Sequence, residues 1–350
     1  MQVFVIIVTY GNRFYLLRQT IDAALAEGVA QVIVIDNNSH EESKTQLKAY
    51  ENKLNGKIRV LYLDENFGSA GGFKRGLQEA YNDSKCEFLW LLDDDNLPLR
   101  GALQSLYSCW ENIKLYDKEK KIALLSWRKN KEFYQIKSII KKDPYLVLGK
   151  KNSFIGFHIF QFPTKLFRFM KRLFFKRDIK LSKYLNNLEK NNINYGEISV
   201  APYGGLFIHK NLIENIGYPD EEFFTYADDH EWTYRITRSG GKIYLCWKSQ
   251  IEDLEMSWHI KDNRLSAFTT LLKSGDDFRT YYSIRNRVYF ENKDLVSNRF
   301  IYNINRSIFL FFLTILSLTI YKIKELKVIK RAVKDGLERN IGKVFLEKLK

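Results

Sequence analysis

The chain has 350 residues, 45% of them hydrophobic, so it is long enough to bury a large core and to form two subdomains. Its 21 tyrosines and 25 phenylalanines exclude an intrinsically disordered protein. The formal net charge of +15 indicates an anionic partner, which could be nucleic acid, anionic lipid or a phosphorylated substrate.

The three cysteines, Cys86, Cys109 and Cys246, lack the spacing of a metal site and leave one thiol over if two pair. This favours a reducing compartment, with the cysteines as small buried hydrophobes. The sequence opens directly on an apolar strand pattern without the features of a signal peptide, and we therefore expect a cytoplasmic protein.

Apolar runs alternate with helical patterns along the first part of the chain. Strands are predicted at residues 3–8, 31–36, 57–63 and 87–92, and a helix at 14–26. Ser39 and Glu42 have the spacing of a capping box, which predicts the start of a second helix. A glycine-rich turn, "ENFGSAGGFKRG", opens a third. This alternation predicts parallel βαβ units in a doubly wound α/β sheet, in which ligands bind beyond the carboxyl ends of the strands.

The later part of the chain is less regular. Strands are predicted at 122–127, 206–209 and 242–246, and a helix begins near Asp229. We expect four regions: residues 1–127, a basic aromatic insertion at 128–195, a second catalytic half at 196–292, and a helical C-terminal region at 293–350.

The run "FLWLLDDDN" places three carboxylates directly after a buried strand. A solvated turn or a helix N-terminus is the alternative reading of such a run. At the carboxyl end of a strand, these oxygens suit Mg²⁺ or Mn²⁺ bridged to substrate phosphates. Because side chains alternate along an extended segment, we expect Asp93 and Asp95 to share a direction and Asp94 to face elsewhere.

Two further motifs each have a structural and a functional reading. Gly71 and Gly72 indicate close approach of the backbone to a ligand, or only a turn and helix packing. The acids of "DDHEW", starting at Asp228, are helix caps, or they bind a sugar and supply a general base. His259 beside Trp258 is either a structural residue or a ligand.

Taken in order, "VTYGNR", "VIVIDNNS", "ENFGSAGGFKRG", "WLLDDDNLP", "YGGLFIHKNLIENIG", "FFTYADDHEWTYR" and "YYSIRN" resemble the family 2 glycosyltransferases of the GT-A fold. More narrowly, they resemble the bacterial rhamnosyl- and galactofuranosyltransferase branch, over about residues 1–292. The resemblance implies a Rossmann-like, mostly parallel sheet with flanking helices, followed here by a basic, helical C-terminal region. A Trp-Trp pair found in galactofuranosyl polymerases is replaced by Gly204 and Gly205, which argues against a processive polymerase.

The resemblance also implies a role for each matching position. Asp93, Asp95 and His259 would hold Mg²⁺ or Mn²⁺, and Asp229 would be the general base. The nucleotide sugar, with UDP or dTDP, would contact Thr9, Tyr10, Asp36, Asn66, Gly71, Gly72, Arg75 and Asp94. The acceptor would contact Gly204, Gly205, Asp228, Glu231 and Trp232. One carboxylate base suffices for direct displacement with inversion, and no second nucleophile is apparent.

Two basic or apolar segments remain. Residues 165–183 carry eight Lys and Arg against one acid, interleaved with Phe and Leu, which indicates a helix on an anionic membrane or an ordinary surface helix. The apolar run 308–321 is too short to span a bilayer and is predicted to be a core helix, an interfacial segment or a contact in a homo-oligomer. No nucleic-acid-binding motif is present, so nucleic acid is not expected as a partner.

These observations lead to one main hypothesis and two rivals. We expect an inverting, metal-dependent glycosyltransferase, peripheral on the cytoplasmic face of the inner membrane. It would use UDP-galactofuranose, or next dTDP-rhamnose, to extend a lipid-linked cell-surface polysaccharide such as O-antigen or capsule. A nucleotidyltransferase would release pyrophosphate, and the third hypothesis is a non-catalytic membrane- or nucleic-acid-binding protein.

Overall fold

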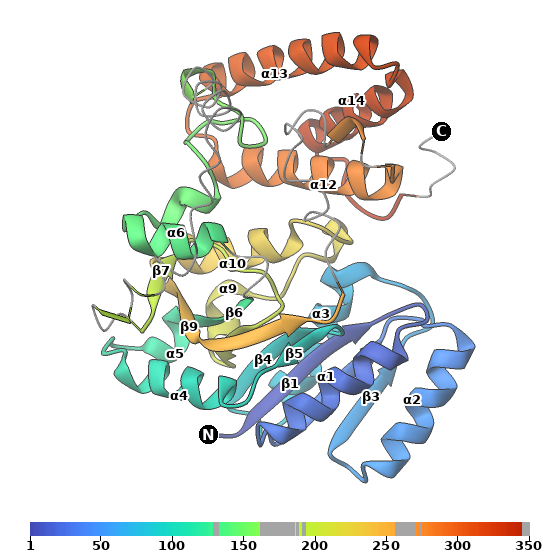
Figure 1. Cartoon of the computed structure of the whole chain (residues 1–350), viewed down its shortest axis with the longest axis vertical. Coiled ribbons are helices and arrows are strands. Elements are labelled where there is room, and N and C mark those ends of the chain that lie inside the picture. The colour runs from blue at the N-terminus through green and yellow to red at the C-terminus, as the bar shows by residue number, and fades with distance from the viewer. Residues whose placement is uncertain are drawn as a thin grey trace. The chain divides into compact units, whose positions relative to one another are not determined.

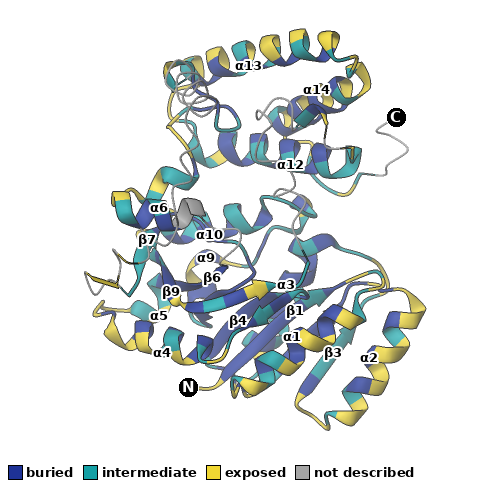
Figure 2. Ribbon diagram, viewed as in Figure 1, coloured by how far each residue is buried: buried dark blue, intermediate teal, exposed yellow. Residues whose placement is uncertain are grey.

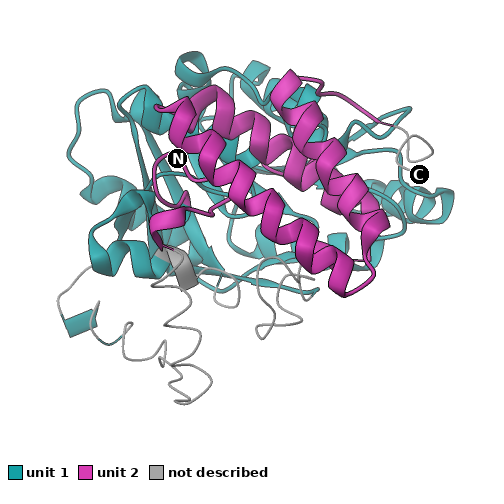
Figure 3. Cartoon of the chain, turned by 90° about the horizontal axis from the view of Figure 1, so that it is seen from above, with its two compact units in different colours: residues 1–147, 184–224, 228–258 teal, residues 148–183, 225–227, 259–350 magenta. Residues whose placement is uncertain are grey.

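A computed structural model describes residues 1–128, 133–161, 186, 189–190, 194–255, 271–273 and 275–344, and the side chains of 133–135 are outside this description. The chain divides into two compact units (Figure 3). Unit 1 comprises residues 1–147, 184–224 and 228–258, and unit 2 comprises 148–183, 225–227 and 259–350. The predicted segment 165–183 lies outside the described residues.

Unit 1 is built on one sheet flanked by helices (Figure 1). Its strands are β1 (Val3–Thr9), β2 (Gln31–Asp36), β3 (Ile58–Tyr62), β4 (Phe88–Asp93), β5 (Asn96–Pro98), β6 (Ile122–Arg128), β7 (Gly196–Ile198), β8 (Leu206–His209) and β9 (Lys242–Asp253). The spatial order is β3-β2-β1-β4-β8-β6-β9-β5, and β7 pairs with β9. Strands β1 to β4 are mutually parallel, whereas β8 is antiparallel to both β4 and β6. The predicted mostly parallel α/β sheet is therefore confirmed.

The helices of unit 1 follow the strands as the sequence predicts for βαβ units. They are α1 (Phe14–Ala26), α2 (Glu41–Lys53), α3 (Gly68–Asn82), α4 (Ala102–Asn112), α5 (Lys118–Lys121), α6 (Phe133–Lys141), α9 (Leu212–Ile216) and α10 (Asp228–Arg238). Short 3₁₀ turns lie at Pro144–Val147, Ile159–Gln161 and Glu221–Phe223, of which the second belongs to unit 2.

Strand β1 shows why this sequence forms a central strand. All but one of its residues are buried, so its alternating side chains enter two cores, one on each face of the sheet (Figure 2). Val3, Val5 and Ile7 belong to the core shared with α1, α2 and α4. On the other face, Gly72 of α3 lies so close to the strand that a Cβ atom would be 2.6 Å from Cγ1 of Val8. Glycine at this position lets α3 pack directly on the sheet.

Unit 2 is mainly helical. Its long elements are α12 (Asp277–Phe290), a π-helical turn (Glu291–Leu295), α13 (Arg299–Thr319) and α14 (Ile323–Glu338). Gly336 allows α14 to approach α12, because a Cβ there would be 2.4 Å from the carbonyl oxygen of Arg285. Glu291 is buried and accepts hydrogen bonds from Arg287 (Nε, 2.8 Å), Tyr302 (hydroxyl, 3.2 Å) and the amide of Ile155 (3.1 Å).

Helix α13 is longer than the apolar run predicted from the sequence. With 21 residues, it is long and apolar enough by composition to cross a membrane, and 28% of its most apolar window is buried inside the protein. The sequence predicted a segment too short to span a membrane. That prediction was wrong, because the helix begins at Arg299, nine residues before the run at 308–321.

Candidate active site at the carboxyl edge of the sheet

Three predicted site residues end neighbouring parallel strands. In the strand register, Thr9 of β1 pairs with Asp36 of β2, and Val8 of β1 pairs with Asp93 of β4. The register therefore brings the ends of these three strands, and the polar side chains on them, to one edge of the sheet. This is the edge at which doubly wound sheets bind ligands.

Asp94 is the most tightly held of the three consecutive aspartates. Its carboxylate accepts two hydrogen bonds from Nε of Arg13 (2.9 and 3.1 Å), one from Nη2 of Arg13 (2.8 Å) and one from the Thr9 hydroxyl (2.9 Å). Burial raises the pKa of this carboxyl, and the hydrogen bonds from Arg13 and Thr9 oppose that rise. Asp94 thus joins β1 and the start of α1 to the aspartate triplet through its own side chain.

Asp93 lies in a different environment. Its side chain is 39% exposed, and its carboxylate is 3.2 Å from Nη1 of Arg128, at the end of β6. The Asp93 amide donates to Oδ1 of Asn96 (3.0 Å). Gly204 makes room for both groups, since a Cβ there would be 2.6 Å from Oδ2 of Asp93 and 2.3 Å from Oδ1 of Asn96. The missing side chain keeps the space beside the Asp93 carboxylate open.

Asp95 is close to two cationic or polar groups, Nη2 of Arg13 at 4.0 Å and Nδ2 of Asn96 at 3.4 Å. Asn96 also donates to Asp253 at the end of β9 (2.8 Å). Strands β5 and β9 pair at this point, with Asn96 opposite Asp253. The asparagine therefore links the triplet to a second strand end.

The carboxylates of Asp93 and Asp95 are of the chemical type that a hard divalent cation prefers. They offer oxygens at a strand end, one of them partly exposed, beside a glycine whose Cβ would fill the space. Within the described ranges, no three His, Cys, Asp or Glu side chains are grouped as a complete metal site. The third predicted ligand, His259, lies outside the described residues. A Mg²⁺ bridged to substrate phosphates usually takes one or two carboxylates from the protein.

Asp36 is fully buried at the end of β2. Its Oδ1 accepts from the amide of Ser39 (2.9 Å), whereas Oδ2 has no hydrogen-bond partner among the residues that the structure describes. A buried carboxylate oxygen without a donor is costly, and a ligand N–H would relieve that cost. Tyr10 follows Thr9, the strand partner of Asp36; it is 48% exposed, with the guanidinium of Arg13 5.4 Å from its ring centre.

The glycine-rich segment is attached to the same edge by two asparagines. Asn37 donates to Oδ1 of Asn66 (3.1 Å) and to the carbonyl of Gly68 (2.9 Å), and it accepts from the amide of Phe67 (2.9 Å). Asn66 in turn accepts from the amide of Gly68 (2.8 Å). These bonds fix the start of α3 against the end of β2.

The predicted ligand contacts at Gly71, Gly72 and Arg75 lie within α3 itself, not in a turn before it. A Cβ on Gly71 would be 2.5 Å from Cβ of Phe67, so this glycine, like Gly72, permits close packing. Arg75 donates to Glu221 (3.0 Å), which also accepts from Lys74 (2.6 Å). This cluster is partly exposed and presents two cations to one carboxylate.

The two neighbouring acids at the start of α10 differ in their surroundings. Asp228 is buried and accepts from the Ser69 hydroxyl (2.8 Å), at the start of α3. Burial first, and then the charge of Asp229, raise the pKa of Asp228 to about 8. Asp229 is half-buried, with Oδ1 accepting from the amide of His230 (2.7 Å). Asp229 therefore has the more accessible carboxylate.

Tyr203 and Gly204 lie near the two acidic groups. Gly204 lies against Asp93, whereas the Tyr203 hydroxyl is buried without a hydrogen-bond partner among the described residues. Burial first, and then the charge of Asp228, raise the pKa of this hydroxyl. The hydrogen bond from Ser69 to Asp228 joins the start of α3 to the start of α10.

Three other predicted acceptor residues lie inside the protein. Glu231 is buried and paired with Arg235 (2.6 Å), and Trp232 is buried with Nε1 donating to the carbonyl of Gly217 (2.9 Å). Gly205 has a φ of +94°, which favours glycine, and a Cβ there would be 2.9 Å from Ile251. Their contacts in the structure hold the framework around Tyr203 and Gly204.

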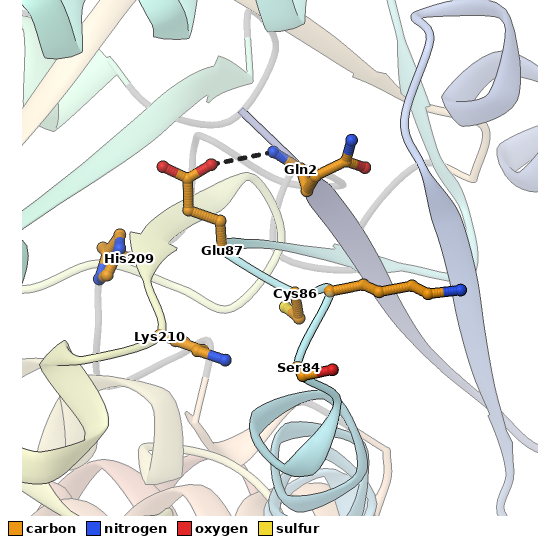
Figure 4. Close-up of a pocket in the computed structure, with 7 residues that line it drawn as sticks. Gln2, Ser84, Cys86, Glu87, His209 and Lys210 are labelled. Carbon is orange, nitrogen blue, oxygen red and sulfur yellow. Dashed lines mark hydrogen bonds between the residues drawn. The ribbon is translucent and has the colours of Figure 1, made fainter.

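A cavity of about 490 Å³ lies at the opposite edge of the sheet (Figure 4). Glu87, His209 and Lys210 are among its lining residues, next to the start of β4 and the end of antiparallel β8. Burial raises the pKa of the lining Cys86 thiol to about 12, so this thiol stays protonated and unreactive at neutral pH. The cavity is separate from the predicted site residues.

Several polar residues of the site were not predicted from the sequence. They are Arg13, Asn37, Ser69, Asn96, Arg128, Tyr203 and Asp253. Arg13 and Asn37 fall inside motifs that the family resemblance used, "VTYGNR" and "VIVIDNNS", and that signal could have included them. Arg128 and Asp253 have no local signal, because only strand pairing places them beside the triplet.

Comparisons with known proteins agree with this fold. The fold resembles GalNAc-T7 in a structure with UDP, GalNAc and Mn²⁺, at 13% identity and a TM-score of 0.52, covering 83% of this chain and 48% of that one. It also resembles the mannosyltransferase PcManGT from Pyrobaculum calidifontis in complex with GDP-Man and Mn²⁺, at 13% identity and a TM-score of 0.51, covering 96% and 75%. The chain thus spans about half the length of the first protein and three quarters of the second. No curated protein matches the sequence.

These likenesses agree with the predicted GT-A fold class. Residues 4–174, just under half of the chain, match the model for glycosyl transferase family 2. This match supports the predicted family and class of enzyme, and the fold confirms the predicted fold class.

Proposed function

We propose that this protein is an inverting, metal-dependent glycosyltransferase that moves a sugar from a nucleotide diphosphate donor to a lipid-linked glycan. The observations that carry the proposal are the carboxylates of Asp93 and Asp95 at the end of β4, beside Gly204, and the hydrogen bond of Ser69 to Asp228, the neighbour of Asp229. In such a region, one set of carboxylates would hold the cation that stabilises the leaving group. Another carboxylate would accept the proton of the nucleophile.

The donor would lie along the carboxyl edge of β1, β2 and β4. Asp36 offers a buried carboxylate oxygen to an N–H of the nucleotide base, and Tyr10 an exposed ring beside it. The solved structures with UDP and with GDP-Man support a nucleotide donor in general. Of the donors with this chemistry, we propose UDP-galactofuranose first and dTDP-rhamnose second, from the resemblance of the motifs.

Asp93 and Asp95 would hold Mg²⁺ or Mn²⁺. When bound, this cation would neutralise the growing charge on the nucleoside diphosphate leaving group. Both structures similar in fold were determined with Mn²⁺, which supports the same dependence here. Asp94 is already bound to Arg13 and Thr9, so its part is to hold the triplet in place at the donor.

Asp229 would take the proton of the acceptor hydroxyl. A hydroxyl is a poor nucleophile until a positioned base accepts its proton. Asp229 has the exposure for this role, whereas Asp228 is buried, bound to Ser69 and held largely protonated at pH 7 by its raised pKa. Direct attack assisted by one base inverts the configuration at the anomeric carbon.

The acceptor and the location are proposed together. A lipid-linked glycan lies at the cytoplasmic face of the inner membrane, and a peripheral enzyme with a net charge of +15 would be drawn to that anionic surface. The glycan would enter beside Gly204 and the start of α10, and O-antigen or capsule intermediates are acceptors of the right kind.

A screen of nucleotide sugars with the full-length protein tests the proposal. We expect release of the nucleoside diphosphate from one donor in the presence of Mn²⁺ or Mg²⁺, and faster release when a lipid-linked acceptor is added. Release of pyrophosphate would instead indicate a nucleotidyltransferase. No release from any donor would favour a non-catalytic binding protein.

A further inference from the structure

Helix α13 carries an apolar stripe on its exposed side. Phe300, Ile304, Phe311, Ile315 and Leu318 are 36–74% exposed and recur at intervals of three, four or seven residues, which places them on one helical face. Figure 2 shows exposed positions repeating along this helix. After the helix, Tyr321 and Ile323 are 89% and 49% exposed.

The buried face of the same helix contains polar side chains beside Phe309 and Leu313. Asn305 is buried, donating to the carbonyl of Asn152 (2.8 Å) and accepting from the amide of Ile159 (2.9 Å). Tyr302 is buried with its hydroxyl on Glu291, and Ser317 is buried with its hydroxyl on the carbonyl of Lys322. A surface helix in water ordinarily turns its apolar residues toward the protein and not toward solvent. The exposed stripe therefore needs an apolar surface outside unit 2.

The charge around the stripe indicates what kind of surface this is. Residues 299–344 contain ten Lys and Arg and three acids. Lys324, Lys327, Lys330 and Lys334 are exposed along α14, which forms an antiparallel pair with α13 (Figure 1). An apolar stripe accompanied by cations is complementary to the interface of an anionic lipid bilayer.

We propose that α13 lies in the surface of an anionic membrane, with its stripe inserted among the lipids and the cations of α14 on the headgroups. The inference adds a binding surface to the function proposed above and relies on that function only for its purpose, which is to hold the enzyme near a lipid-linked acceptor.

The helix lies along the membrane and does not cross it, although its length and composition would allow crossing. Its buried side packs on Phe154 and Phe157, with ring centres of Phe309 at 5.3 and 5.8 Å. Crossing would separate these rings and take Tyr302 away from Glu291, a buried carboxylate that would lose a hydrogen bond.

Vesicle flotation of the full-length protein tests this surface. We expect binding to phosphatidylglycerol/phosphatidylcholine vesicles and much weaker binding to phosphatidylcholine alone. The double variant Phe311→Ser, Ile315→Ser should weaken binding at least about tenfold, because two inserted apolar side chains are lost. Its control is Leu115→Ser, Tyr116→Ser, which removes two exposed apolar side chains from unit 1 and should bind like wild type.

The charge contribution is tested separately. Lys327→Gln, Lys330→Gln, Lys334→Gln should also weaken binding about tenfold or more, and high salt should do the same to wild type. Lys53→Gln, Lys57→Gln, Lys114→Gln is the control, since it removes the same charge from exposed positions of unit 1.

A fluorescent label reports insertion directly. All three native cysteines are buried, so Ser307→Cys on the exposed side of α13 can be labelled selectively with an environment-sensitive dye. Its emission should shift to the blue on anionic vesicles, whereas the same label at Asn52→Cys on α2 should not shift.

Each outcome decides the proposal. Binding of the stripe variant at the wild-type level, or an unshifted label at position 307, would overturn it. If wild type does not bind vesicles and sedimentation velocity shows a dimer that the stripe variant dissolves, the face is a contact between two copies. Donor hydrolysis without vesicles should be equal in all variants. Its absence from wild type would refute the proposed function and leave the membrane surface intact.

Discussion

The carboxyl edge of the sheet in unit 1 and helix α13 in unit 2 both carry side chains in surroundings that are unusual for a soluble protein. At the sheet edge these groups are carboxylates, and most are partnered by arginines, as Asp94 is by Arg13 and Asp93 by Arg128. On α13 they are exposed apolar side chains, while Asn305 on the same helix is buried.

This difference indicates which kind of ligand each surface binds. Strand ends leave side chains without a covering layer, and paired charges there are positioned for a small charged ligand such as a diphosphate. A long helix with an exposed apolar stripe suits instead the apolar interior of a lipid bilayer. Substitutions can test whether the sheet edge takes part in catalysis and whether α13 serves only for binding to a surface.

The largest effect is expected at Asp229. Asp229→Asn keeps the size of the side chain and removes its capacity to accept a proton, so kcat should fall by about 10² to 10⁴ while KM for the donor changes little. The measurement is steady-state kinetics with a saturating acceptor. Asp228→Asn is the matched neighbour, and a dead Asp228→Asn beside an active Asp229→Asn would show that the base is Asp228.

The ion pair of Arg13 and Asp94 should control stability. Arg13→Ala leaves the buried Asp94 carboxylate without its cation, which should lower the free energy of unfolding by about 3–5 kcal/mol in denaturant titration. Arg18→Ala removes an exposed pair with Asp22, side chains 56% and 54% exposed, and should cost about 0–1 kcal/mol. Similar losses in the two variants would mean that the sheet edge is not held by this pair.

Asn286 of α12 offers a link between unit 2 and the chemistry. Its Nδ2 donates to the carbonyls of Thr225 and Tyr226 (2.7 and 2.9 Å), in a segment where Phe224, Tyr226 and Ala227 have φ of 61–65°. Such strained backbone persists only where its surroundings hold it, and this segment runs directly into α10.

Asn286→Ala should therefore lower kcat about tenfold by loosening the start of α10, with KM for the donor nearly unchanged. Asn303→Ala, an exposed asparagine on α13, is the control and should keep the wild-type rate. Unchanged kcat in a folded Asn286→Ala variant would show that Asn286 does not support the catalytic site.

The smallest effect is a change in pH dependence at Asp228. Its folded pKa of about 8 lies above that of a free carboxyl, so the folded state binds the extra proton between these two values. The stability that this proton contributes is complete at low pH and is lost as pH rises through about 8.

Asp228→Asn resembles the neutral carboxyl and should escape this loss. The variant's Tm relative to wild type should therefore rise between pH 5 and pH 9, by at least about 2 °C. Parallel Tm curves for the two proteins would show that Asp228 is ionised throughout.

The regular elements of unit 1 could be predicted from the sequence. The helix at 14–26 and the strand at 206–209 have the predicted bounds, because their apolar patterns are strong and their ends are marked. The start of α2 was predicted wrongly. Ser39 does not cap it, since the helix begins at Glu41 after His40, and the Ser39 amide instead donates to Asp36.

The site was predictable only in part. A motif shows that Asp93 follows a strand, but it cannot show that Arg128, 35 residues later, faces it. The strand predicted at 242–246 continues to Asp253, because its later half pairs with β5 and with the end of β6 after a bulge. Those long-range pairings place Asp253 beside Asn96, and no local sequence pattern predicts such pairings.

The central claim is that the carboxylates at the end of β4 make a metal-dependent site for a nucleotide sugar. Its most direct test is the rate of nucleoside diphosphate release by wild type and Asp95→Ala, with and without EDTA. The account predicts release by wild type that EDTA abolishes and Mn²⁺ restores, and no release by a folded Asp95→Ala variant. Full activity in EDTA, or in Asp95→Ala, would contradict it.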